Sequence, residues 1–500
     1  MKKTSFISKL SSGVILMTVS NLIVKAAGLF FKIPLTSLIG EEGMGYFNSA
    51  YTLFTWFYML CAAGLPAAAS MLIAKIPQKH RSDGALRIFR ISLTIFTSLG
   101  LLGCLILIFA SGPISHIMRV ENSRPAIIAV APTLFFVCQS AALRGYFQGF
   151  GDLKWHSLSQ VIEALGKVSL GVALAYHAVE SGQSIATAAA YAAAGITIGV
   201  AAGMLVLYIA FMLRKRPIGY PELTPTRVHA RRLITAALPI TLSSSVMSLT
   251  NLIDSLIMTR SLHAIGMSQA EVAAIWGNYS SLAVPMFNLP PVLTMPIAYA
   301  LLPALSAALA SGERKKADTL VYDAVRNTTL IAIPCAVGMA AMSEPILALL
   351  FADDVAERGA MLLTLLAPSS MLLCMLGLTN TILQASGHER VPLYAMLCGA
   401  AAKLTATWVL TPSLGKYATP ISTFICYFTV MIISVIAIAL LTPMKKAIGF
   451  KPCLKPLIAA SLSVTLAVII YPMTGTLVAI ASAAVGYFLI SAIGEKMHGG

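Results

Sequence analysis

The segment LRGYFQGFGDLKWHSLSQVIEALGK, residues 143–167, decides the fold, because a related segment, TNTILQASGHERVPLYAMLCGAAAK, occupies residues 379–403. Three residues recur at one constant offset, namely Gln148 with Gln384, Gly151 with Gly387 and Lys167 with Lys403. Internal repeats of this kind are a common plan of membrane transporters. The sequence therefore predicts two structurally related halves.

Weaker matches extend the repeat to other parts of the chain. The tripeptide Asn21-Leu22-Ile23 recurs as Asn251-Leu252-Ile253, and Pro66 recurs as Pro296. Six predicted helices separate the two copies, so both run in the same direction across a membrane. This predicts two pseudo-symmetric six-helix lobes with a cavity between them, at residues 1–216 and 217–446, and two extra helices within 447–500.

The composition places most of the chain in lipid. Hydrophobic residues make up 58% and charged residues 11% of the 500 residues, and the mean hydropathy is +0.83. A bilayer-crossing helix needs roughly 20 apolar residues, which predicts an all-α polytopic membrane protein with about fourteen transmembrane helices. The predicted spans are 13–36, 46–74, 86–110, 124–147, 156–178, 185–213, 230–259, 272–303, 318–341, 359–385, 391–411, 417–441, 454–471 and 474–494.

The net charge is +16, and the positions of the charged residues along the chain say more about function than their sum. Most basic residues lie in alternate loops, whereas the intervening loops carry acids such as Glu41, Glu180 and Glu344. The positive-inside rule then predicts a multi-pass protein of a bacterial cytoplasmic membrane with both termini in the cytoplasm. The basic balance indicates contact with anionic membrane lipids and not with nucleic acid.

Several other site classes are excluded by the sequence. The apolar run after MKKTSFISKL is interrupted by Asn21 and Lys25 and is followed by more spans, so we interpret it as a first helix and not as a cleaved signal. The eight cysteines contain no CxxC pair, which predicts neither a metal site nor a disulfide framework. No HExxH, GxSxG, P-loop or dinucleotide motif is present. We therefore expect no enzyme and no cofactor.

With the repeat segment, the stretches KAAGLFFKIPLTSLIGEEGMGYFNSAYTLF (25–54) and AAGLPAAASMLIAK (62–75) resemble the family of stage V sporulation protein B and MurJ-like lipid II flippases. This family lies within the multidrug/oligosaccharidyl-lipid/polysaccharide (MOP) exporter superfamily. The resemblance implies a flippase that carries an undecaprenyl-diphosphate-linked saccharide, lipid II or a related wall precursor, from the inner to the outer leaflet. It also implies that the last two helices form a groove for the lipid tail.

The resemblance implies a basic cavity as well. The MurJ-like branch has basic cavity residues in its first helix, where Lys25 and Lys32 lie at similar places. Its cavity arginines in helices 2 and 8 have no counterpart, because helix 2 has no basic residue before Lys75 and helix 8 has none.

Charged residues inside predicted spans are the candidates for function, because each is costly in lipid. We predict that Lys25, Lys32, Lys167 and Lys403 line the substrate cavity. For Lys25 the alternative is a structural ion pair, and for Lys32 it is snorkelling to the interface. Lys167 has Glu163 at the favourable i−4 position, so these two charges can neutralise each other. Lys403 has Gly399 at that position, which makes it the better ligand candidate.

Asp254 and Glu163 are the two acids that lie deep within predicted spans. Asp254 lies one residue from the repeat equivalent of Lys25. The two are predicted to form either a latch that opens when a substrate diphosphate competes, or a permanent structural pair.

Two other functions compete with a flippase. A multidrug or metabolite antiporter of the MATE-like branch would favour intramembrane carboxylates, whereas this chain has four lysines against two acids deep within its predicted spans. A membrane-embedded glycosyltransferase or polymerase would need a catalytic acid or a large outer loop, and the longest outer gap, 342–358, is too short. We expect a monomer driven by the membrane potential, without nucleotide.

Overall fold

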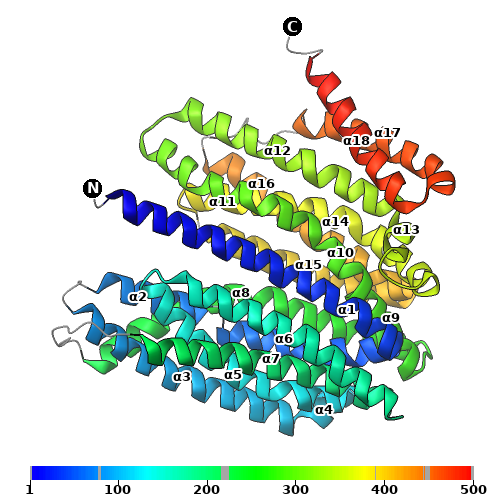
Figure 1. Ribbon diagram of the computed structural model, residues 1–500. Helices are drawn as coiled ribbons and strands as arrows, with labels where there is room; N and C mark the ends of the chain where they lie inside the picture. The colour runs from blue at the N-terminus through cyan, green and yellow to red at the C-terminus, as the bar shows by residue number, and fades with distance from the viewer. Residues whose placement is uncertain are drawn as a thin grey trace. The chain divides into compact units, whose positions relative to one another are not determined.

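The computed structural model describes residues 3–62, 64–76, 80–214, 225–388, 390–442, 444 and 451–496. Within these residues every regular element is a helix and no strand is present (Figure 1). Helices follow from such apolar segments, because lipid offers no partner to backbone polar groups and a helix satisfies them internally. The prediction of an all-α polytopic membrane fold is confirmed.

Ten helical stretches of the described residues are long and apolar enough to cross a membrane. Two of them, Ala26–Ile73 with 48 residues and Val391–Leu441 with 51 residues, exceed twice the roughly 20 residues that one crossing needs. Each of these two is therefore long enough to cross twice. The number of fourteen spans stays a prediction.

The first long stretch is divided by a glycine. Helix α1, Lys3–Ala62, is broken at Gly40, whose φ of 67° lies in the left-handed region that glycine adopts at little cost. The break separates two segments that correspond to the predicted spans 13–36 and 46–74. Helix α2, Gly64–Lys75, continues the second of them.

The chain forms two compact units, of which the first covers Met1–Gly277. Its long helices α5, α6 and α7 lie side by side (Figure 1). Its core is built from α2, α3, α5, α7 and α8 around Leu65, Phe96, Phe147 and Leu207. Besides α1 and α2, its elements are α3 Arg81–Phe109, α4 Ser111–Ile117, η1 Glu121–Ser123, α5 Arg124–Gly149, α6 Leu153–Glu180, α7 Ile185–Leu213, α8 Thr226–Ala264 and α9 Gln269–Asn278, which ends at the boundary.

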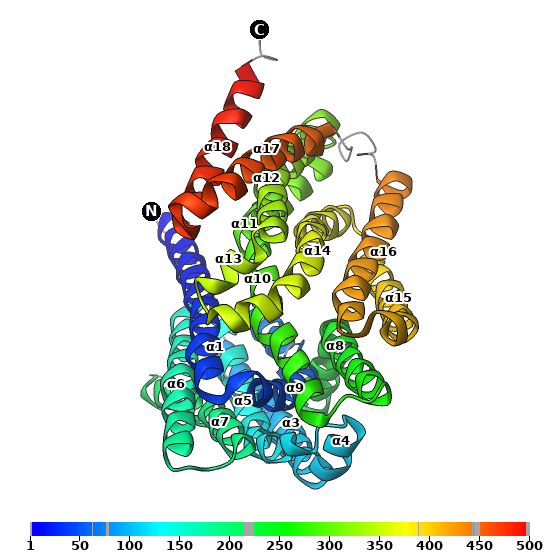
Figure 2. The ribbon, with the colours of Figure 1, turned by 90° about the vertical axis from the view of Figure 1, so that its right-hand side faces the viewer.

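The second unit covers Asn278–Gly500. Helices α15 and α16 form an antiparallel pair, and α17 packs against both α12 and α18 (Figure 2). One of its core clusters surrounds Leu305, Val321, Leu383 and Ile438. Its elements are the π-helical turn η2 Tyr279–Ala283, α10 Val284–Phe287, α11 Leu289–Ala310, α12 Arg314–Ala341, α13 Ser343–Ala348, α14 Asp353–Ala385, α15 Val391–Leu414, η3 Gly415–Tyr417, α16 Ala418–Leu441, α17 Lys451–Thr474 and α18 Thr476–Lys496.

The two repeat segments adopt the same local structure. Residues 143–167 form the end of α5, a turn and the first half of α6, and residues 379–403 form the end of α14, a turn and the first half of α15. The matched glycines stand in both turns with positive φ, 73° at Gly151 and 81° at Gly387. The predicted lobe boundaries after residues 216 and 446 lie outside the described residues, so the lobes 1–216, 217–446 and 447–500 stay a prediction.

Candidate functional site

A partly buried ion pair joins α5 to α6 in the first unit. A terminal guanidinium nitrogen of Arg144 lies 2.8 Å from Glu163 Oε2, and the two side chains are 9% and 26% exposed. Arg144 Nε also donates to Ser159 Oγ at 3.2 Å. The guanidinium is thus held at two points, and the charge of Glu163 is neutralised by a residue from another helix.

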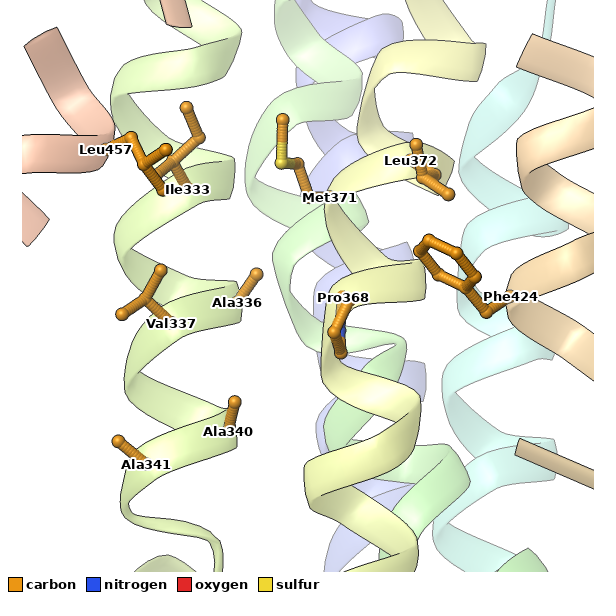
Figure 3. A pocket seen from close by; sticks show the side chains of 10 residues that line it. All are labelled: Ile333, Ala336, Val337, Ala340, Ala341, Pro368, Met371, Leu372, Phe424 and Leu457. Carbon is orange, nitrogen blue, oxygen red and sulfur yellow. The ribbon is translucent and has the colours of Figure 1, made fainter. Parts of the chain in front are cut away.

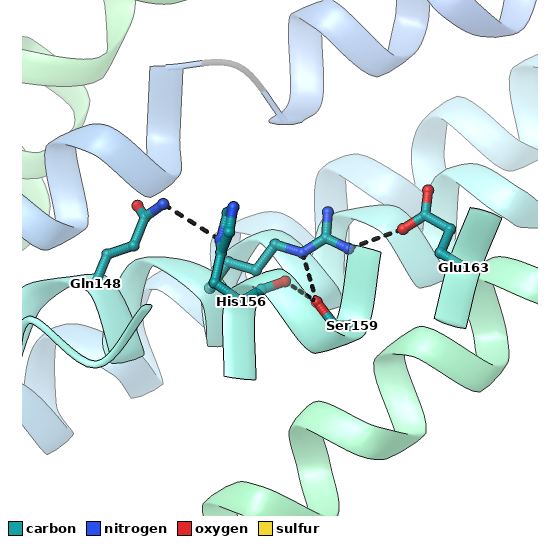
Figure 4. A network of polar contacts seen from close by, with 5 residues as sticks. Gln148, His156, Ser159 and Glu163 are labelled. Atoms are coloured by element: carbon teal, nitrogen blue, oxygen red, sulfur yellow. Dashed lines mark hydrogen bonds and ion pairs between the residues drawn. The ribbon is translucent and has the colours of Figure 1, made fainter. Parts of the chain in front are cut away.

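The network continues along α6 (Figure 4). Ser159 Oγ donates to the carbonyl of His156 at 2.7 Å, and Gln148 Nε2 lies 3.2 Å from His156 Nδ1. His156 and Ser159 are buried. Buried polar groups are costly unless they are hydrogen-bonded, so these contacts hold the carboxyl end of α5 and the start of α6 in one arrangement.

Lys167 lies one turn beyond Glu163 on α6, and its ammonium faces aromatic rings. Lys167 Nζ is 4.6 Å from the ring centre of Tyr51 and 5.1 Å from that of Phe31, both on α1. Among the described residues no carboxylate lies within 4.0 Å of Lys167. Lys32 is close enough for the two positive charges to repel each other. The predicted neutralisation of Lys167 by Glu163 is therefore not the arrangement found, because Arg144 takes the carboxylate.

Glycines on α7 place α6 at this position. A Cβ on Gly199 would lie 2.7 Å from the Lys167 backbone nitrogen and 2.8 Å from the Glu163 carbonyl oxygen, and one on Gly203 would lie 2.8 Å from the Ser159 carbonyl oxygen. Side chains at these positions would push the helices apart. Small residues are what allow helix backbones to approach closely in membranes. The backbone that carries Glu163 and Lys167 is thus seated directly on α7.

Lys403 lies in the second unit, on α15, and is only 5% exposed. Thr407 Oγ1 contacts the Lys403 carbonyl at 3.0 Å and donates to Ser422 Oγ of α16 at 2.8 Å. Tyr427 of α16 is within electrostatic range of the ammonium. Lys403 therefore belongs to a buried, hydroxyl-rich contact between α15 and α16.

The remaining candidates are Asp254 and Lys25. Asp254 lies on α8 and is 1% exposed, which agrees with an acid held inside the protein. The side chain of Lys25 lies outside the described part of the chain. The latch between them stays a prediction.

An apolar cavity of about 500 Å³ lies in the second unit (Figure 3). Helices α12, α14, α16 and α17 supply its walls, and no charged side chain lines it. Its lining residues are Ile333, Ala336, Val337, Ala340, Ala341, Pro368, Met371, Leu372, Phe424 and Leu457. Among the described residues no group of three or more His, Cys, Asp or Glu side chains is placed to hold a metal ion.

Arg144 was missed by the sequence reasoning, although a signal for it existed. It lies inside the predicted span 124–147, where every charged residue is a candidate by the rule applied to the lysines. The structure shows it 7% exposed.

Comparison with known proteins gives two family matches. The polysaccharide biosynthesis protein family matches residues 10–309, and the MatE family matches residues 239–409. Among curated proteins, stage V sporulation protein B of Bacillus subtilis is 25% identical over 81% of this chain and 78% of its own length. The lipid II flippase MurJ of Bacillus subtilis is 22% identical over 79% of this chain and 76% of its own length.

Solved structures show the same fold. The lipid II flippase MurJ in an inward closed conformation superposes with a TM-score of 0.76 at 14% identity, covering 96% of this chain and 99% of that one. An inward-facing MATE transporter of the MOP superfamily gives a TM-score of 0.63 at 18% identity, covering 82% and 96%. At these identities the likeness establishes the architecture alone.

Proposed function

This chain belongs to the polysaccharide biosynthesis protein family, and we propose that it carries an undecaprenyl-diphosphate-linked saccharide from the inner to the outer leaflet by alternating access. The predicted resemblance to MurJ and stage V sporulation protein B within the MOP superfamily is confirmed. The chain is a multi-pass membrane protein. The substrate is a lipid II-like precursor of a wall or polysaccharide.

The arrangement of Lys32 and Lys167 carries this proposal. Lys167 holds its ammonium over the rings of Tyr51 and Phe31, and Lys32 lies near it on α1, so an anion bound here gains two ammonium partners inside membrane-spanning helices. The contact of Lys167 with Tyr51 and Phe31 is a cation–π interaction, worth about 0.5–2 kcal/mol, and hydrogen bonds to a charged group are worth about 1.5–3 kcal/mol. A diphosphate is therefore able to draw the ammonium away from the rings.

The apolar cavity of the second unit supports the lipid part of the substrate. A site for an isoprenoid chain needs a wall without charges, and the side chains of α12, α14, α16 and α17 provide one. Leu457 on α17 belongs to this wall, so a helix from the C-terminal pair contributes to it. The expectation that this pair contacts the lipid tail stays part of the proposal.

A multidrug antiporter is the second candidate, because the MatE family matches residues 239–409. Such antiporters favour intramembrane carboxylates that bind cations. Here Arg144 neutralises Glu163, so Glu163 is not available to a cation, and the neighbouring Lys167 adds a positive charge to this part of the first unit. This arrangement favours an anionic substrate over a cationic drug.

Complementation tests the two candidates. In a bacterium depleted of its own lipid II flippase, the wild-type chain should restore growth, and Lys32→Gln/Lys167→Gln at equal membrane abundance should not. In the same cells, resistance to cationic dyes should be unchanged by the chain. Dye resistance without restored growth would replace the flippase by the antiporter.

Orientation and assembly belong to the same proposal. We place both termini in the cytoplasm, the basic loops against anionic lipid headgroups, and a single chain as the transporting unit. Fusion of an alkaline phosphatase reporter after residue 182, in the turn between α6 and α7, should give activity outside the cell. Activity for a fusion after residue 312, between α11 and α12, would contradict this orientation.

A further inference from the structure

We infer that Arg144 is a positioning residue, which holds Glu163 away from Lys167 so that the Lys167 ammonium stays available to the diphosphate. The inference rests on the proposed function for the ligand, but the charge arrangement itself is a property of α5 and α6. Arg144 is buried and held by two contacts, so it is not itself placed to bind substrate.

Helix geometry makes Glu163 a competitor for Lys167. An acid four residues before a lysine on one helix brings the two side chains to the same face, in the favourable order for an ion pair. In a low-dielectric region the attraction is larger than in water. Without another partner, Glu163 would therefore take the ammonium of Lys167, and one of the two cations would be lost.

The contact with Arg144 prevents this outcome. Glu163 Oε2 lies 2.8 Å from the guanidinium, and Lys167 Nζ instead lies over the rings of Tyr51 and Phe31. Arg144, Glu163 and Lys167 together carry two positive charges and one negative charge. The remaining positive charge sits on Lys167 because the arginine is already paired with the carboxylate, and an anionic diphosphate is a ligand that such a charge attracts.

The second copy of the repeat supports this reading. The position of Glu163 is taken there by Gly399, and the position of Arg144 by Asn380. Both charges are thus absent together, while the lysine remains as Lys403. If Arg144 served the helix turn alone, its counterpart would be equally needed in the matching turn at Gly387. The arginine instead occurs only in the copy of the repeat whose lysine has an acid at the i−4 position.

The first test measures affinity for undecaprenyl diphosphate by native mass spectrometry of the purified full chain. Arg144→Gln should weaken binding about tenfold or more, the loss expected for one charged contact, because Glu163 then captures Lys167. Glu163→Gln should stay within about threefold of wild type, and Arg144→Gln/Glu163→Gln should recover most of the loss. Equal losses for the two single variants would mean that the pair is structural only.

The second test needs no substrate. Apparent unfolding temperatures in detergent are measured for Glu163→Gln, Lys167→Gln and the double variant, first with Arg144 present and then in Arg144→Gln. With Arg144 present, the changes in unfolding temperature caused by Glu163→Gln and Lys167→Gln should add up in the double variant. In the Arg144→Gln background they should not add up, because the two side chains then interact with each other. Additivity in both backgrounds would overturn the inference. Tighter binding of undecaprenol than of undecaprenyl diphosphate by the wild-type chain would instead refute the proposed function. The unfolding measurements would still decide the role of Arg144, because they need no ligand.

Discussion

Arg144 of α5 and Glu163 of α6 form an ion pair at 2.8 Å, so the carboxylate of Glu163 is paired with an arginine of another helix and not with Lys167 of its own helix. The i−4 neighbour of Lys167 is engaged by another helix. Lys167 consequently contacts aromatic rings, beside Lys32. The charge arrangement of the site therefore depends on a contact between helices and not on spacing within one helix.

Lys167 and Lys403 should fail in different ways when they are replaced. From the sequence, Lys403 is the better candidate for a substrate ligand, because only Lys167 has an acid, Glu163, four residues before it. In the structure Glu163 is paired with Arg144, so this argument against Lys167 no longer holds. We expect Lys167→Gln to reduce transport about tenfold or more with little change in unfolding temperature. Lys403→Gln, at a 5% exposed position, should mainly lower the unfolding temperature. Flipping rates and melting curves at equal protein amounts measure the two effects. A Lys403→Gln variant that is stable but does not transport would support the sequence-based preference for Lys403 as the ligand.

Because α6 and α7 lie so close together, a side chain at Gly199 should destabilise the protein. Its Cβ would lie 2.7 Å from the Lys167 backbone nitrogen, so Gly199→Ala should cost about 1–3 kcal/mol of stability. Gly338→Ala on α12 is the matched control, because its Cβ would meet no atom within 4 Å. The control should be neutral or slightly stabilising. Equal thermal stability of the two variants in detergent would show that α6 and α7 do not pack this closely.

Lys25 is predicted to be needed for transport but not for folding. It lies about twelve residues into the first predicted span, roughly 18 Å deep at 1.5 Å per residue, where snorkelling is difficult. Lys25→Ala should insert normally and lose transport, and Lys25→Arg should retain part of it. Normal flipping by correctly inserted Lys25→Ala would remove Lys25 from the site and leave Asp254 without its proposed latch partner.

Much of the fold could be predicted from hydropathy, because an apolar segment in lipid has few alternatives to a helix. The repeat in 143–167 and 379–403 also matched Gly151 with Gly387, and in the structure these two glycines stand in corresponding turns with positive φ. The site was harder. The i, i+4 spacing within α6 predicted an ion pair between Glu163 and Lys167, but the partner of Glu163 in the structure is Arg144 of α5. A sequence pattern does not tell which face of another helix packs against that carboxylate. The aromatic contacts of Lys167 were missed for the same reason.

Transport should respond to the membrane potential. Moving a diphosphate outward carries about two negative charges from an inside-negative compartment, which supplies about 4.6 kcal/mol per 100 mV if the lysines do not move with it. In proteoliposomes, a potassium-diffusion potential should change the flipping rate, and a pH gradient at zero potential should not. Flipping driven by the pH gradient and abolished in Asp254→Asn would make Asp254 a coupling carboxylate.

The most direct test of the central claim is the outward transfer of lipid II in proteoliposomes that hold the purified chain. The leaflet distribution is read by an enzyme or lectin that reaches only the outer surface. Wild-type protein should expose lipid II at a rate that rises with protein per vesicle, and Lys32→Gln/Lys167→Gln should return the rate to that of empty vesicles. Equal rates for the wild type and the double variant, or no exposure by the wild type, would contradict the account.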